Sequence, residues 1–281
     1  MEDPRPESYL RRIGLSEPPE TDESGLAILM AAHLRTVPFE NLDVYHRRGV
    51  PLDATQAVTK IVERGRGGWC FELNSAFALL LESLGFTVER LAASVLIGDG
   101  EPPTPDHLTL LVHLERTWLV DVGFGDSFTV PLPLPESGGT TTDLDSRPRP
   151  HRLSRTGDEL LLEALGDRGW APQFRAVLRD VDLAHFAPAS DRLQHTPGLH
   201  WTETRFATRL TPTGRVTLLH DRLKYHQGDS ITEVAVTEAE WHRLLAEIFS
   251  MGGMEPVDRP EPPDSPERGA QLGRLLERLR S

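Results

Sequence analysis

Residues 66–74 read RGGWCFELN and contain Cys70, the only cysteine of this 281-residue chain. Two glycines lead into an apolar segment whose spacing predicts a helix that begins at Cys70 and ends before Gly85, a residue suited to a helix C-terminus. A single cysteine forms no intramolecular disulfide, so Cys70 is either a small buried side chain or a reactive thiol. The N–H groups and partial positive charge of a helix N-terminus stabilise a thiolate, which favours the reactive thiol.

The composition is that of an acidic globular protein. Hydrophobic residues make up 38% of the chain and charged residues 26%, and no apolar run approaches the roughly 18–20 residues that span a bilayer. The net charge of −13 argues against binding of nucleic acid or an anionic membrane, but a local arginine patch can still hold an anionic cofactor. One thiol, and charged residues 1–7 with no apolar segment behind them, predict a cytoplasmic protein without a signal peptide.

The order of the predicted elements indicates an α+β fold with helices and strands in separate layers. Asp22 and Asp53 are predicted helix N-caps, and Thr237 with Glu240 forms a capping box at a late helix. Strand patterns begin after Gly85, and two strands flank a tight turn to form a hairpin. We expect helices at residues 8–15, 23–35, 54–63, 70–84, 182–194, 238–250 and 270–280, strands at 86–97, 107–114, 118–122, 151–165, 172–178, 205–210, 215–220 and 231–236, and an extended surface loop at 131–150.

His107 and Asp121 are the candidate partners of Cys70. A catalytic cysteine needs a base to take its proton, and the base needs a group that orients it. Among 11 histidines, His107 opens a strand after the proline-rich loop at residues 101–106, where a side chain is held rigidly and stays accessible. Asp121 lies at the end of the partner strand, so the hairpin places both residues at the same end of a two-stranded ribbon. A carboxylate there fixes the tautomer of the imidazole and stabilises the imidazolium.

Other readings of these carboxylates stay open. Asp121 also suits a cap of the turn at residues 122–125, and Asp106 and Asp126 are rival partners of the histidine. Asp106 is adjacent to His107, so the alternation of side chains along a strand points the two to opposite faces. Asp126 follows a glycine-rich segment and suits a turn.

These motifs together resemble the arylamine N-acetyltransferase family. The resemblance rests on residues 66–74, on His107, and on DVGFG at residues 121–125; VPFENL at residues 37–42 is a further family-like segment. The similarity is strong over about residues 8–130, and beyond that only the length and the coarse order of elements agree.

The resemblance implies a catalytic triad of Cys70, His107 and Asp121 around a core like that of cysteine proteases. It implies an acyltransferase in which the Cys70 thiolate takes an acetyl or other acyl group from acyl-CoA. An aromatic amine or hydrazine then attacks the acyl-cysteine, so acetyl-CoA is the implied co-substrate and no metal is implied. The implied parts are an N-terminal helical bundle (residues 1–85), a central β-barrel (86–195) and a C-terminal α/β lid (196–281).

Residues around the triad are assigned by the same resemblance. Phe39, Val95 and Phe124 are candidates for the acceptor pocket, with plain core packing as the alternative. Gly125 and Asp126 are candidates for contact with CoA, where the chain passes the pantetheine arm. The family commonly has a second glycine in place of Asp126, and a carboxylate close to the pyrophosphate of CoA is unfavourable.

Four further residues flank the nucleophile. Glu40 and Arg66 resemble an ion pair that orders the active-site segment. Glu72 and Asn74 suit the surface or the packing face of the helix equally well. The backbone N–H of Cys70 is one expected donor to the oxyanion of the reaction.

Three alternative functions compete with the acyl-CoA-dependent acyltransferase. The first is an amide synthase that releases a polyketide from an acyl carrier protein by macrolactam formation, and Asp126 favours it slightly because a carrier protein presents no nucleotide. The second is a thiol hydrolase, and the third is a non-catalytic binding protein. We expect a monomer or a dimer, because the last helix is able to dock on its own chain or on a partner.

Overall fold

The computed structural model describes residues 6–97, 102–144, 149–228, 230–263 and 265–280. Residues 1–5, on which the expected absence of a signal peptide depends, and Glu101 of the proline-rich loop lie outside these ranges. Within them, no helix is long and apolar enough to cross a membrane.

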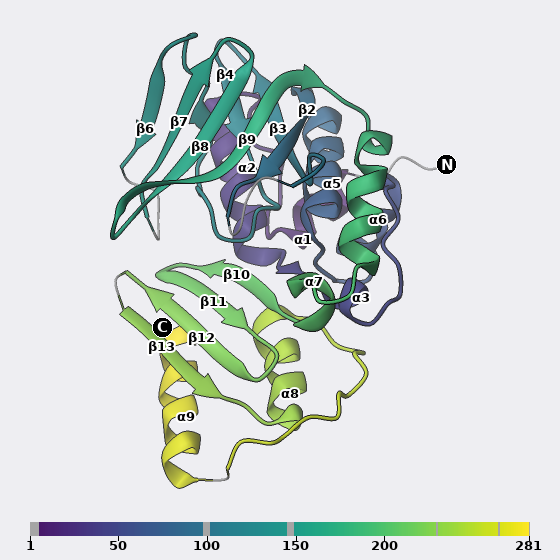
Figure 1. Cartoon of the computed structure of the whole chain (residues 1–281), viewed down its shortest axis with the longest axis vertical. Helices are drawn as coiled ribbons and strands as arrows, with labels where there is room; N and C mark the ends of the chain where they lie inside the picture. The colour runs from purple at the N-terminus through teal and green to yellow at the C-terminus, as the bar shows by residue number, and fades with distance from the viewer. Residues whose placement is uncertain (1–5, 98–101, 145–148, 229, 264, 281) are drawn as a thin grey trace.

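Helices form the first part of the chain (Figure 1). The Asp22 carboxylate accepts a hydrogen bond from the N–H of Gly25 at 2.8 Å, and the Asp53 carboxylate accepts one from the N–H of Gln56 at 3.0 Å. Both predicted N-caps are therefore confirmed. The helices are α1 (Pro6–Arg12), α2 (Glu23–Thr36), α3 (Leu42–Tyr45), α4 (Ala54–Val58), which continues into a π-helical turn (Thr59–Glu63), and α5 (Cys70–Ser83).

An eight-stranded antiparallel sheet forms the centre of the molecule, in the order β5-β4-β3-β2-β9-β8-β7-β6. Its edge strands β5 and β6 contact each other, so the sheet is a nearly closed barrel. The predicted hairpin is β3–β4, with Leu110 opposite Val120. The strands are β2 (Thr87–Val95), β3 (His107–His113), β4 (Thr117–Val120), β5 (Leu132–Pro133), β6 (Thr140–Asp143), β7 (His151–Thr156), β8 (Glu159–Gly166) and β9 (Gly169–Asp180).

The prediction of an extended surface loop at residues 131–150 is wrong for Leu132–Pro133 and Thr140–Asp143, which form β5 and β6, and residues 145–148 of this segment lie outside the described ranges. Strand β6 is polar along its length and pairs by backbone hydrogen bonds with β7, where Thr141 lies opposite Leu153. An edge strand of this kind shows no alternation of apolar residues, so its sequence resembles a loop.

A second, five-stranded sheet forms the lid, in the order β1-β10-β11-β12-β13. Its first strand comes from the N-terminal part, since Phe39 of β1 pairs with Thr208 of β10. The lid elements are β1 (Phe39–Glu40), α7 (His200–Glu203), β10 (Ala207–Thr211), β11 (Gly214–Leu218), β12 (Arg222–Gln227), β13 (Ser230–Ala235), α8 (Glu238–Phe249) and α9 (Pro266–Arg280). Helix α6 (Ala187–His195) precedes α7 and packs beside α5 in the core of the helices and the barrel. Thr237 and Glu240 form the predicted capping box, whereas α7 and β12 are missed by the prediction.

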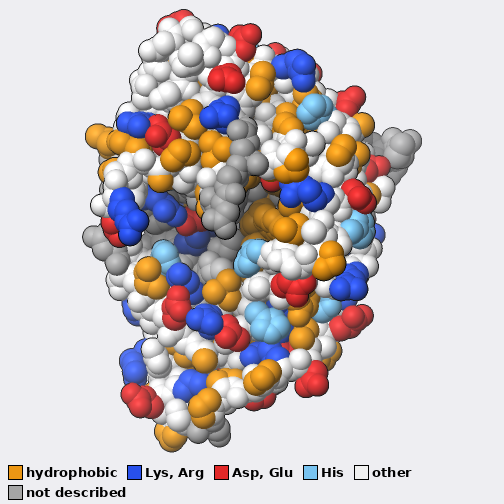
Figure 2. Space-filling model, in the orientation of Figure 1, with side chains coloured by type: hydrophobic (Ala, Val, Ile, Leu, Met, Phe, Trp, Pro, Cys, Tyr) orange, Lys and Arg blue, Asp and Glu red, His pale blue; other side chains and the backbone are white. Residues whose placement is uncertain are grey.

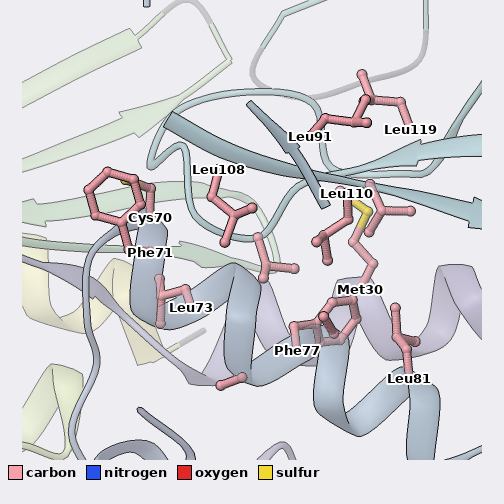
Figure 3. Close-up of a cluster of buried hydrophobic side chains, with 14 of the residues drawn as sticks. Met30, Cys70, Phe71, Leu73, Phe77, Leu81, Leu91, Leu108, Leu110 and Leu119 are labelled. Carbon is pink, nitrogen blue, oxygen red and sulfur yellow. The ribbon is translucent and has the colours of Figure 1, made fainter. Parts of the chain in front are cut away.

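Helix α5 packs its apolar side chains against β2 and β3. Figure 3 shows Leu73, Phe77 and Leu81 of α5 on the side that faces the barrel leucines. A separate apolar core lies between the lid sheet and helices α8 and α9, in which Leu272 and Leu275 of α9 are buried. The α+β architecture is thus confirmed, and it places the N-terminus of α5 where the helices, the barrel and the lid meet; the division at residues 85 and 195 stays a prediction.

Candidate active site

Cys70 is the first residue of α5, and its side chain is 5% exposed. The two glycines before it allow the chain to pass close to β1 and to α5. A Cβ on Gly67 would lie 2.0 Å from the carbonyl oxygen of Pro38, and one on Gly68 would lie 2.8 Å from Glu72. No larger side chain fits at either position, so the paired glycines bring the nucleophile to the junction of the three parts.

His107 and Asp121 lie beside Cys70, as the hairpin argument predicts. Nε2 of His107 is 2.6 Å from Oδ2 of Asp121, and both side chains are buried. The Cys70 thiol and the His107 ring line the same cavity, and the thiol stabilises the charged form of the imidazole. Burial by itself lowers the pKa of His107, but the Asp121 carboxylate and the Cys70 thiol raise it to about 10. An imidazolium beside the sulfur stabilises a thiolate at neutral pH.

Asn74 holds Asp121 in place. Its amide Nδ2 donates to Oδ1 of Asp121 at 2.9 Å and to the carbonyl oxygen of Leu108 at 2.6 Å. Its Oδ1 accepts the N–H of Val122 at 2.9 Å. This positioning of Asp121 was not predicted from the sequence, although Asn74 follows Cys70 by four residues and therefore lies on the same face of the helix.

Rival carboxylate Asp106 points elsewhere. Its Oδ1 accepts the N–H of Val95 at 3.0 Å and its Oδ2 lies 3.3 Å from Arg192, whereas its backbone carbonyl oxygen is 3.9 Å from the sulfur of Cys70. Asp121 is therefore the carboxylate that contacts His107.

A buried network of charges supports the first turn of α5. Arg66 lies 2.6 Å from Glu40, and Nζ of Lys60 lies 2.7 Å from Asp43 and 2.8 Å from Glu72. Glu72 also accepts the backbone N–H of Trp69 at 3.2 Å, which ties the network to the residue before the nucleophile. Burial raises the pKa of Glu72 to about 6, even though Lys60 opposes this shift. The resemblance named the Glu40–Arg66 pair, and the sequence gives no signal for Lys60, which occupies a polar position of an amphipathic helix.

A cavity of about 650 Å³ opens over Cys70 and His107. Phe39, Val95 and Phe124 all line it, so the structure brings the three candidate pocket residues to one place. The ring of Phe124 meets the His107 ring edge to face at 5.1 Å between centroids. Four residues from α6 and α7 that also line the cavity were not predicted, because no local motif marks them: Arg192, Leu193, His200 and Trp201.

Comparison with known proteins identifies the family. A family model described as N-acetyltransferase matches residues 24–253. The arylamine N-acetyltransferase of Mycolicibacterium smegmatis is 33% identical over 257 residues, covering 88% of this chain and 90% of that relative. The chain belongs to the arylamine N-acetyltransferase family.

Solved arylamine N-acetyltransferases share the whole fold. The enzyme from Salmonella typhimurium superposes with a TM-score of 0.80 at 26% identity, covering 97% of this chain and 98% of that one. The enzyme from Mycobacterium marinum, solved in complex with CoA, superposes with a TM-score of 0.77 at 28% identity, covering 87% and 92% of the two chains. The three-part architecture expected from the arylamine N-acetyltransferase family is confirmed.

Asp126 is where this member of the arylamine N-acetyltransferase family departs from the expected glycine. Gly125 has a φ of +91°, and a Cβ there would lie 3.0 Å from the ring of Phe39, so only glycine fits. The turn directs Asp126 into a second cavity of about 310 Å³. There it lies 2.7 Å from Arg149 and 3.1 Å from Arg215. Burial raises the pKa of Asp126, but the two arginines outweigh it and lower the pKa.

The part of the chain that the structure describes contains no recognisable metal-binding site. No group of three or more His, Cys, Asp or Glu side chains is arranged there to hold an ion. The candidate site is instead a thiol, an imidazole and a carboxylate at the wall of an aromatic cavity.

Proposed function

We propose that the chain transfers an acetyl group from acetyl-CoA to an arylamine through an acetyl-cysteine at Cys70. One observation carries the proposal: Cys70 and a hydrogen-bonded His107–Asp121 pair lie together at the wall of a cavity. Relatives along most of the chain are named arylamine N-acetyltransferases, and one solved relative binds CoA. The roles of Cys70 as nucleophile, His107 as acid and base, and Asp121 as orienting carboxylate are part of this proposal.

The first half-reaction acylates Cys70. The thiolate attacks the carbonyl carbon of the thioester, the bond from that carbon to the sulfur of CoA breaks, and the His107 imidazolium gives its proton to the departing thiolate. The products are free CoA, acetyl-Cys70 and a neutral imidazole. N–H groups at the N-terminus of α5, that of Cys70 among them, are the proposed donors to the oxyanion.

The second half-reaction regenerates the site. An arylamine nitrogen attacks the acetyl carbonyl carbon, the bond to the sulfur of Cys70 breaks, and neutral His107 takes the proton that the amine loses. The thiolate and imidazolium are thereby restored. Asp121 holds the imidazole in one orientation in both steps.

The walls of the cavity suit an aromatic acceptor. Phe39, Val95 and Phe124 line it next to the sulfur, and Trp201 adds a third aromatic ring from the lid. Phe39 and Trp201 already meet edge to face at 5.9 Å between ring centroids. Aromatic pairs of this kind favour a flat aromatic ring over an aliphatic chain.

The donor also fits the site. In the second cavity Nε of Arg215 is buried and has no hydrogen-bond partner among the described residues, which is chemistry suited to a phosphate of CoA. When bound, acetyl-CoA supplies the activated thioester.

Intact-mass measurement tests the proposal. Incubation with acetyl-CoA and no acceptor is expected to add one acetyl mass, and an arylamine is then expected to remove it as the acetylated amine. Because the chain has a single cysteine, Cys70→Ser is expected to abolish the adduct. The proposal fails if no adduct forms from acetyl-CoA, or if the acetyl group is found on another residue.

An acyl carrier protein stays the alternative donor, and an amide synthase the alternative function. The same mass assay with an acyl carrier thioester decides between the donors. The expected cytoplasmic location and the monomeric or dimeric state stay predictions. Burial of Leu272 and Leu275 of α9 in its own lid supports the monomer, which size-exclusion chromatography with light scattering tests.

A further inference from the structure

Three residues form what we call the Asp126 cluster: Asp126 and Arg215, which line the second cavity, and Arg149, which pairs with Asp126. The second cavity shares Phe39, Phe124 and His200 with the cavity over Cys70, so the two are adjacent. Figure 2 shows a hollow in the middle of one face of the molecule, with Lys, Arg and His side chains around it. Arg215, Lys224 and His226 line the second cavity, so the active site continues into a region rich in basic groups.

The Asp126 cluster has a net positive charge. Two guanidinium groups share one carboxylate, at 2.7 Å from Nη2 of Arg149 and 3.1 Å from Nε of Arg215. The side chain of Arg215 is only 7% exposed, whereas that of Arg149 is 39% exposed. Asp126 thus holds two like charges side by side, one of them almost wholly removed from water.

Two atoms of the Asp126 cluster lack hydrogen-bond partners. Nε of Arg215 and Oδ1 of Asp126 are both buried, and neither has a partner among the described residues, because their 3.1 Å approach lacks hydrogen-bond geometry. A buried donor without an acceptor costs free energy unless a ligand or water satisfies it. The pair therefore suits a ligand that carries both an anionic acceptor and an N–H donor.

We propose that the Asp126 cluster binds the phosphate of the phosphopantetheine arm of the acyl donor. This inference rests on the proposed function, because it concerns the donor of that same reaction. A phosphopantetheine arm offers phosphate oxygens to the guanidinium groups and amide N–H groups to Oδ1 of Asp126. Guanidinium groups bind phosphate with paired, charge-assisted hydrogen bonds.

The position of the cluster matches the reach of such an arm. A Cβ on Gly123 would lie 2.9 Å from Cα of Cys70, so the loop starts against the nucleophile. Asp126 follows three residues later, at most roughly 11 Å along the chain. An arm whose thioester lies at Cys70 therefore passes Gly125, where the absence of a side chain leaves room, and ends at the arginines.

The structure also removes the objection that Asp126 repels the donor. A lone carboxylate in place of glycine would oppose a phosphate. Here each oxygen of the Asp126 carboxylate faces an arginine, so the negative charge of the carboxylate is compensated. The carboxylate instead holds the side chains of Arg149 and Arg215 in position. The departure from the family pattern is thus a change in how the phosphate is held.

Binding measurements on the whole protein test the inference without any turnover. The probes are CoA, 4′-phosphopantetheine and pantetheine, titrated by calorimetry. Phosphopantetheine is expected to bind at least about tenfold more tightly than pantetheine, since hydrogen bonds to charged groups are the strong ones. Arg149→Gln is expected to reduce this ratio to less than about threefold and to leave the affinity for pantetheine unchanged. Equal affinities of the wild type for the two arms would overturn the inference, and so would an unchanged ratio in the variant.

Matched variants separate binding from folding. Arg152 lies on β7, is similarly exposed and pairs with Glu163 at 2.6 Å, so Arg152→Gln is the control and is expected to keep the full ratio. Arg215→Gln is expected to lose the ratio as well. If the variant at the buried Arg215 unfolds, Arg149→Gln decides the inference by itself. Arg149 lies closer to solvent, so its substitution is expected to leave the fold intact.

CoA and a carrier protein present the same phosphate, so two donors identify its source. Acylation of Cys70 by acetyl-CoA and by an acetyl carrier protein is compared in wild type and Arg149→Gln. The donor that acylates the wild type is the source of the phosphate. A lower acylation rate of Arg149→Gln with that donor supports the inference, and an unchanged rate contradicts it. Acetyl-pantetheine, which lacks the phosphate, separates the two proposals: an adduct from it upholds Cys70 chemistry even where the Asp126 cluster fails.

Discussion

Asn74 donates a hydrogen bond of 2.9 Å to Asp121 from the helix turn that follows Cys70. The helix that presents the nucleophile therefore also holds the carboxylate that orients His107. The N–H of Gly123 donates to the same oxygen of Asp121 at 2.8 Å, which leaves the other oxygen for the imidazole. Three segments of the chain are thus aligned by one buried amide side chain.

Asn74→Ala is expected to slow acylation of Cys70 by about 10- to 100-fold. The variant leaves Oδ1 of Asp121 with one donor fewer and leaves the N–H of Val122 without its acceptor, so the imidazole is held less firmly. Stability is expected to fall by about 1–3 kcal/mol for the unsatisfied buried groups. Single-turnover acylation by acetyl-CoA and urea unfolding measure the two effects.

Ser75→Ala is the control for this prediction. Ser75 is also buried on α5, but its hydroxyl donates to the backbone carbonyl oxygen of Glu72 at 3.2 Å and has no other hydrogen-bond partner among the described residues. Its acylation rate is expected to stay within about threefold of the wild type, since charged or catalytic groups are not involved. A rate loss in Ser75→Ala equal to that in Asn74→Ala would show that packing of α5, rather than the amide, matters.

Asp121→Asn is expected to change the pH profile of Cys70 alkylation. Burial lowers the pKa of His107 and Asp121 raises it, so the neutral amide removes the main cause of the raised value. In the wild type the imidazolium persists to about pH 10 beside the sulfur, and the rate with iodoacetamide at pH 6–7 is expected to exceed that of the variant. In the variant the rate at pH 6–7 is expected to fall at least about tenfold and to rise with pH, as for an ordinary thiol with a pKa of about 8.5.

A parallel loss at every pH would contradict this prediction. It would mean that Asp121 acts on access to the sulfur and not on the charge of His107. Asp126→Asn is the matched control, because Asp126 faces Arg149 and Arg215 instead of the imidazole.

His107 also makes stability depend on pH, with a definite sign. Its pKa is about 10 in the folded protein and about 6.5 in an unfolded chain. The folded state binds the extra proton between these values, so the contribution of His107 is fully present below pH 6.5 and is lost as pH rises through 10. The slope is at most about 1.4 kcal/mol per pH unit.

Urea unfolding of wild type and His107→Gln from pH 6 to 10 measures this contribution. The difference in stability is expected to be largest at pH 6 and to shrink steadily toward pH 10. His113→Gln is the control on the same strand, since His113 is half-exposed and bonds Thr117 at 3.1 Å. A difference for His107→Gln that stays constant with pH would mean that the histidine is neutral in the folded protein.

That His107 and Asp121 lie together was predictable because their spacing is local. His107 and Asp121 lie in one hairpin whose turn is visible in the sequence, and Cys70 begins a helix marked by two glycines. The helix caps at Asp22 and Asp53 depend on neighbouring residues only, and both predictions are confirmed. Caps and hairpins of this kind are determined by residues that are close together in the sequence.

Residues whose role depends on distant segments escaped prediction. Lys60 has a position typical of a solvated helix face, yet Asp43 and Glu72, far along the chain on either side, enclose it. Trp201 reaches the cavity from α7, a helix too short to have a recognisable pattern. Strand β6 is stabilised by its partner strand and not by an apolar face, so only the folded barrel defines it.

Lys60→Met is expected to destabilise the protein by about 3–5 kcal/mol, because it leaves buried carboxylates without a counter-charge. Glu72 then keeps only the donor from Trp69, and its pKa is expected to rise further above the present value of about 6. The destabilisation should therefore be smaller at pH 5, where Glu72 is protonated, than at pH 8. Acylation of Cys70 is expected to slow as well, since Glu72 anchors Trp69, the residue before Cys70.

Arg90→Met is the control for this prediction. It removes a partly exposed ion pair with Glu82 at 2.7 Å and is expected to lower the stability by less than about 1 kcal/mol at both pH values. Equal effects of the two variants would show that the buried network contributes no more than a surface ion pair.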